Sequence, residues 1–79
     1  MADEDDLLWE RDMDGESLVK DILYNGNSGY SILIIDDNTH ERYYWGNIDK
    51  SKKYHVRVIE YNRFAWDYTK LIYHIKEIE

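Results

Sequence analysis

The sequence predicts a small, mainly β domain, a five-stranded barrel of the OB-like or SH3-like type, preceded by a disordered acidic tail. Three observations support this fold class. Short β-branched and aromatic runs alternate with turn residues, the length of 79 residues permits one modest core, and acidic residues are concentrated at the N-terminus. We therefore divide the chain into a tail, residues 1–16, and a single domain, residues 17–79.

The tail carries the whole net charge. Residues 1–16 contain eight acidic residues and one basic residue, residues 17–79 contain nine of each, and the chain has a net charge of −7. Like charges repel in a compact state, so we expect disorder. Leu8, Trp9 and Met13 are spaced to form a short amphipathic helix on a partner or on the chain's own domain. The alternatives are a tail that only solubilises the domain or one that mimics a nucleic acid.

The first three predicted strands are short. Residues 18–24 end in an Asn/Gly-rich segment suited to a hairpin turn. Residues 30–35 are apolar on both faces, as in a strand inside a covered sheet, and a polar turn follows them at residues 36–40. Residues 42–45 form an aromatic third strand that ends at a Gly-Asn pair.

The last two predicted strands follow a polar connection. Residues 54–61 alternate cleanly, so Tyr54, Val56 and Val58 should share one face. The final segment is ambiguous, because its apolar residues fit both a strand face and an amphipathic helix. Its many aromatic and β-branched residues favour a strand over residues 68–78. An α+β fold with a C-terminal helix over residues 64–78 is the alternative.

The pattern of strands and turns resembles a known family. The runs that carry the likeness are Asp21-Ile22-Leu23-Tyr24-Asn25, Gly29-Tyr30-Ser31-Ile32-Leu33-Ile34, Tyr44-Trp45-Gly46-Asn47-Ile48 and Tyr54-His55-Val56-Arg57-Val58. Over residues 18–78 they resemble the OB-type N-terminal domain of RecD-like helicases. The resemblance implies an OB-type barrel, and the chain departs from the family because it has no helicase domain, no Walker motif and an acidic tail.

Motifs for catalysis and cofactor binding are absent from the sequence. No serine stands beside a histidine, and no phosphate-binding glycine loop or zinc-protease motif occurs. The sequence thus predicts that the chain is not an enzyme and binds no cofactor. Acidic residues from Glu10 to Asp21 approach the spacing of a calcium loop, but the first and last ligand positions depart from it. No metal site is predicted.

Aromatic residues indicate partner binding, because adjacent strand residues such as Tyr44 and Trp45 must face opposite sides and one small core cannot bury them all. Trp, Tyr and Arg are also the residues enriched at protein hot spots. The predicted partner-binding residues are Leu8, Trp9, Met13, Tyr44, Trp45, Phe64 and Trp66. The alternative is single-stranded nucleic-acid binding, through Tyr44, Arg42, Arg57, Arg63, Lys52 and Lys53.

Composition gives a second resemblance. A short chain rich in Asp, Ile, Tyr, Lys and Asn, without proline or cysteine, is similar to the small early proteins of lytic phages. That likeness implies a protein that binds and inhibits or redirects a bacterial host protein in the cytoplasm. The lack of cysteine fits a reducing compartment, and the sequence predicts no membrane insertion. The oligomeric state is left open.

Overall fold

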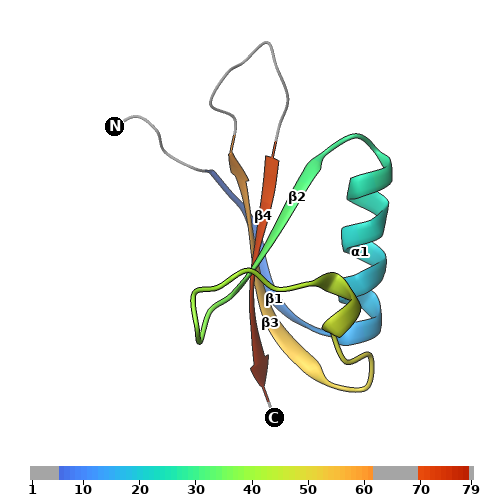
Figure 1. The fold of residues 1–79 in the computed structure, drawn as a ribbon, viewed down its shortest axis with the longest axis vertical. Coiled ribbons are helices and arrows are strands. Elements are labelled where there is room, and N and C mark those ends of the chain that lie inside the picture. Colours follow the sequence, from blue (N-terminus) through green and yellow to red (C-terminus); the bar gives the residue numbers. More distant parts are fainter. Residues whose placement is uncertain (1–5, 62–69, 79) are drawn as a thin grey trace.

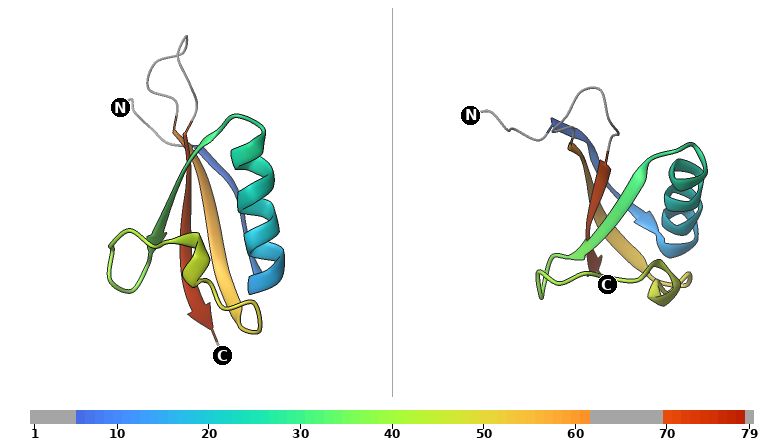
Figure 2. Two further views of the ribbon diagram at one scale, coloured as in Figure 1. Left: turned by 45° about the vertical axis from the view of Figure 1, so that its right-hand side comes forward. Right: turned by 45° about the horizontal axis from the view of Figure 1, so that its top comes forward.

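The computed structural model describes residues 6–61 and 70–78, which form one sheet with a helix on one of its faces (Figure 1). The two further views in Figure 2 show the helix on the same side of the strands. The elements in chain order are β1 (Asp6–Asp14), α1 (Gly15–Asn27), β2 (Ser31–Asp36), the 3₁₀ turn η1 (Trp45–Asn47), β3 (Lys53–Tyr61) and β4 (Lys70–Ile78).

The sheet has four strands in the order β1-β3-β4-β2. β3 is antiparallel to both β1 and β4, and β2 is parallel to β4. β1 and β2 therefore run in the same direction at opposite edges, joined through α1, with β3 and β4 between them. The prediction of a mainly β domain is confirmed. The predicted five-stranded OB-like or SH3-like barrel is not, because the described residues form an open sheet of four strands.

The acidic residues that the structure describes form strand β1 and the start of α1, which corrects the prediction of a disordered tail over residues 1–16 for residues 6–16. Its three inner acids face bases of β3 across the strand pair: Glu10 opposes Arg57, Asp12 opposes His55, and Asp14 opposes Lys53. Cross-strand pairs of opposite charge stabilise a sheet by about 0.2–1 kcal/mol each. The charges that looked repulsive along the sequence are offset by a neighbouring strand.

Helix α1 replaces the strand predicted over residues 18–24. Its buried positions are Gly15, Leu18, Val19 and Ile22, which recur at the three- and four-residue spacing of a helix. Asp14 caps the helix, because its carboxylate accepts a hydrogen bond of 3.1 Å from the Ser17 amide. The Asn/Gly-rich segment ends this helix and does not close a hairpin.

Three of the five predicted strands are confirmed, and residues 42–45, like residues 18–24, do not form a strand. β2 and β3 match the segments predicted at residues 30–35 and 54–61, and β4 confirms the strand over residues 70–78, so the alternative C-terminal helix is wrong there. Residues 62–69 lie outside the described residues. The third predicted strand, residues 42–45, makes only a single bridge, between Ile35 and Arg42, before the chain enters η1.

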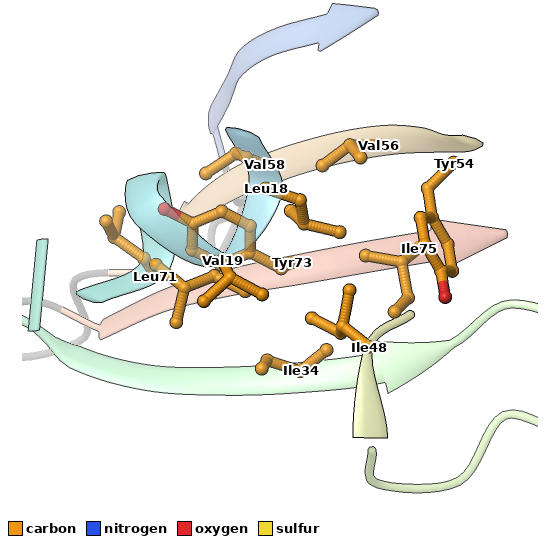
Figure 3. Packing of buried hydrophobic residues seen from close by; sticks show 11 residues of the cluster. Leu18, Val19, Ile34, Ile48, Tyr54, Val56, Val58, Leu71, Tyr73 and Ile75 are labelled. Atoms are coloured by element: carbon orange, nitrogen blue, oxygen red, sulfur yellow. The ribbon is translucent and has the colours of Figure 1, made fainter. Parts of the chain in front are cut away.

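The core lies between α1 and the sheet. Val56, Val58 and Tyr73 on the central strands are at most 1% exposed, as is Leu18 on the helix. Figure 3 shows the close packing of this cluster, which also includes Ile48 from the loop after η1. As predicted, Tyr54, Val56 and Val58 share the buried face. Among the described residues, no helix is long and apolar enough to cross a membrane.

Candidate partner-binding groove

A groove of about 420 Å³ lies between α1, the outer edge of β2 and the segment before η1. This volume is within the range of ordinary ligand sites. The groove has a floor made by β2, one wall made by the helix and one wall made by aromatic residues. Its lining residues are Ile22, Leu23, Gly26, Asn27, Ser31, Ile32, Leu33, Ile34, Arg42, Tyr43, Tyr44, Trp45 and Lys70.

The floor is the outer edge of β2, and only some of the backbone groups along that edge are hydrogen-bonded to described residues. The Ile34 carbonyl accepts a hydrogen bond from the Tyr43 amide at 2.8 Å, and the Asp36 amide donates to the Glu41 carbonyl at 2.9 Å. The amide and carbonyl of one strand residue point to the same edge, and every second residue shares that direction. The backbone groups of Ile32 and the amide of Ile34 therefore point outward, beyond the last bridge that the described residues make with β2.

One wall consists of exposed aromatic rings. Tyr44 and Trp45 are 61% and 40% exposed, and their ring centroids lie 5.5 Å apart in a tilted arrangement. Tyr43 anchors them: it packs on the core, and its hydroxyl donates to the Asn47 carbonyl at 3.1 Å. Burial raises the pKa of Tyr43. The wall thus presents two accessible rings on a fixed base.

The helix supplies the opposite wall. Ile22 belongs to the core, while Leu23 is 41% exposed and lies at the groove. Gly26, one turn after Ile22, has no side chain, and a Cβ there would lie 3.8 Å from Ile32. This small residue leaves the groove open beside the strand.

Two basic side chains, Arg42 and Lys70, flank the groove on the face of the sheet that points away from the helix. Lys70 is the register partner of Ser31, and Arg42 bridges to Ile35. Residues 31, 33 and 35 of β2 share one face of the sheet, and a side chain lies on the same face as its register partner. Lys70 and Arg42 therefore lie on the face that carries Leu33. Neither cation has an ion-pair partner in the part of the chain that the structure describes, and no acidic residue is among the lining residues. The groove is therefore locally positive on a chain with a net charge of −7.

The opposite edge of the sheet is protected in the ways that natural edge strands commonly are. β1 carries charged residues at Glu10, Arg11 and Asp12, and its pairing is interrupted by a bulge between Leu7 and Trp9. Charge and bulges discourage further strand pairing. β2, by contrast, has no charged residue from Ser31 to Ile35.

The groove unites only some of the predicted partner-binding residues. Tyr44 and Trp45 line it. Trp9 and Met13 pack partly against the core, and Leu8 is 47% exposed within the bulge of β1, at the far edge. No amphipathic helix forms around them. Phe64 and Trp66 lie outside the described residues.

The predicted nucleic-acid residues are dispersed. Arg42 and Tyr44 are at the groove, whereas Lys52 pairs with Glu77 at 2.9 Å. Arg57 lies 3.8 Å from Asp37, and Lys53 opposes Asp14. These three bases are offset by acids and do not form a continuous positive path. Arg63 lies outside the described residues.

The near-calcium spacing does not form a loop. Glu10 and Asp12 lie on β1, where Asp12 contacts the Nδ1 of His55 at 2.6 Å and Glu10 contacts its Nε2 at 2.7 Å. Asp14 caps the helix, and Asp21 lies on it. Glu10 and Asp12 thus bind His55, and Asp14 caps the helix. No cluster of metal-ligating side chains occurs among the described residues.

The sequence reasoning missed most of the groove. Ile22, Leu23 and Gly26 were assigned to a strand and its turn, and Lys70 was not singled out. The signals that could have found them are the helix cap at Asp14 and the spacing of Gly15, Leu18, Val19 and Ile22.

Comparison with known proteins adds no relative. No family model matches this chain, and no curated protein or solved structure is significantly similar to it. The resemblances to RecD-like helicases and to early phage proteins therefore stay predictions.

Proposed function

We propose that this chain is a non-catalytic protein-binding module that takes an extended segment of a partner protein into the groove, where the segment adds a strand to β2. The observation that supports this most directly is the outer edge of β2, which is uncharged from Ser31 to Ile35 and whose pairing with residues 6–61 and 70–78 does not continue beyond Ile34 toward Ser31. Strand addition of this kind gives affinity through backbone hydrogen bonds and specificity through alternate side chains.

The walls of the groove support the same proposal. In the free protein, water covers the apolar surface of the exposed aromatic rings beside this strand edge. A bound segment would displace that water and bury the rings. Tyr44, Trp45 and Leu23 are the side chains that would contact such a segment from the two walls. The likeness to early phage proteins makes a bacterial host protein the expected source, with inhibition or redirection of that protein as the outcome.

The test uses peptides selected from a random library on the immobilised full chain. Selected peptides should bind Trp45→Ala at least about tenfold more weakly, because a buried aromatic anchor contributes about 2 kcal/mol. Tyr24→Ala is the matched control: Tyr24 is 71% exposed on the same helix as Leu23 and does not line the groove. It should bind as the unchanged chain does.

Amide hydrogen exchange locates the binding mode. In the free chain, the amides of Ile32 and Ile34 should exchange faster than those of Leu33 and Ile35, which point toward β4, and a bound peptide should slow them. Peptides that bind Trp45→Ala undiminished, or that leave these two amides unprotected, would refute the proposal. So would tight, salt-sensitive binding of single-stranded DNA or RNA without any peptide binding.

A further inference from the structure

The two sides of the β2 edge differ in chemistry, and this difference restricts which segment the groove can accept. A strand added to β2 would direct alternate side chains to opposite faces of the sheet. On the helix side they would meet the apolar residues Ile22, Leu23 and Tyr43. On the other side they would meet Leu33 between two cations, Arg42 and Lys70.

We infer that the preferred occupant is a protein segment in which acidic residues alternate with aliphatic or aromatic ones, the acids facing Arg42 and Lys70. The inference rests on the proposed strand addition and goes beyond it by assigning the charge and the periodicity of the segment. The net charge alone would give the reverse preference, because a chain with a net charge of −7 attracts basic peptides over acidic ones.

The same cations argue against a second copy of this chain as the occupant. If two β2 edges paired about a two-fold axis, Arg42 and Lys70 of one copy would lie near those of the other. Like charges directly across a strand pair are destabilising. An acidic segment removes this repulsion and supplies counter-charges that the described residues do not provide.

Four capped seven-residue peptides test the inference by calorimetry on the full chain. One alternates Glu and Leu, the second alternates Lys and Leu, the third alternates Ser and Leu, and the fourth contains the residues of the first with all the Leu residues adjacent. The alternating Glu/Leu peptide should bind at least about tenfold more tightly than the Lys/Leu peptide, since two exposed charge pairs turn from attractive to repulsive. It should also bind more tightly than the peptide with adjacent Leu residues.

Charge reversal in the protein provides the second arm. The double variant Arg42→Glu/Lys70→Glu should reverse the preference, so that the Lys/Leu peptide binds more tightly than the Glu/Leu peptide. Lys76→Glu is the matched control, because Lys76 is on β4 but does not line the groove. It should keep the original order.

The outcomes separate the two proposals. If the Ser/Leu or Lys/Leu peptide binds best and still protects the Ile32 and Ile34 amides, the charge assignment is wrong while strand addition stands. If the Glu/Leu peptide binds best and the double variant keeps that order, the cations are not its recognition element and the inference fails. If no peptide protects these amides, strand addition itself is refuted.

Discussion

The Tyr73 hydroxyl donates a hydrogen bond of 2.6 Å to the Asp21 carboxylate and so connects the centre of the sheet to α1. The same hydroxyl accepts a hydrogen bond of 2.7 Å from the Asn25 side-chain amide. Tyr73 is fully buried, and its hydroxyl lies under the helix that forms one wall of the groove. A polar contact within an apolar core thus fixes the position of that wall.

Removal of this hydroxyl should weaken the fold. Tyr73→Phe leaves Asp21 and Asn25 without their shared partner, so we expect a loss of about 1–2 kcal/mol in the free energy of unfolding. Urea denaturation measures it, with Tyr24→Phe, at an exposed site, as the control. Burial, and next the hydrogen bond to Asp21, raise the pKa of Tyr73, so in an ultraviolet pH titration this tyrosine should ionise well above the ordinary tyrosine pKa of 10.0. Equal stability of the two variants would contradict this account.

Gly15 should not tolerate a side chain. Its amide donates to the Lys52 carbonyl at 2.7 Å, and a Cβ would lie 2.0 Å from the Asp49 carbonyl oxygen. Gly15→Ala must displace backbone, so we expect a loss of about 3 kcal/mol in the free energy of unfolding. Gly26→Ala, also in α1 but with room for a Cβ, should instead gain up to about 1 kcal/mol. A stable Gly15→Ala chain would show that the close approach is not maintained in solution.

Stability should depend on the charge of His55. The hydrogen bond to Asp12, followed by the one to Glu10, raises the pKa of His55. Lys76 is the register partner of His55 on β4. Because the folded pKa is above the unfolded value of 6.5, the stabilisation is complete below pH 6.5 and is lost as the pH rises through the folded pKa. The site is partly exposed, so the change should be below about 1 kcal/mol.

Two measurements check the behaviour of His55. An NMR titration of the His55 imidazole protons should give a midpoint above the ordinary value of 6.5, and the stability difference between low and high pH should shrink in His55→Gln. A midpoint at or below 6.5 would show that Asp12 and Glu10 do not stabilise the charged imidazole.

The contribution of the Asp14 helix cap to stability should depend on pH. Hydrogen bonds from Ser17 lower the pKa of Asp14, so its stabilisation is present above the unfolded pKa of about 3.9 and is lost as the pH falls through the folded value. Asp14→Ala should lower the melting temperature at pH 6, while Asp14→Ser, which keeps a capping oxygen, should lower it less. If the two variants melt together, the cap does not act as described.

The strands that could be predicted are those whose sequence fits the two-residue period of a strand better than the 3.6-residue period of a helix. Tyr54, Val56 and Val58 alternate with the polar residues His55 and Arg57, and residues 30–35 include three isoleucines. Residues 6–14 were missed because Trp9 and Met13, four apart, share a face in a helix and also in a strand. The acids between them become favourable only when β3 lies beside them, which requires the tertiary fold.

The groove was predictable only in part for a similar reason. Tyr44 and Trp45 were identified from the excess of aromatic residues, and both line it. Their neighbours come from α1 and β4, which the sequence does not place beside them. The order β1-β3-β4-β2 alone brings Lys70 next to Ser31.

The position of β3 and β4 between β1 and β2 also has a consequence for how the chain folds. The first two strands never touch each other, so residues 6–36 alone cannot build a sheet, and contacts such as Asp12 with His55 close a loop of more than half the chain. Contacts between residues so distant in sequence slow folding, because loop-closure entropy is lost before they form. Sheet formation should therefore begin only once β3 is available to pair with β1, and β2 should join only after β4 has formed.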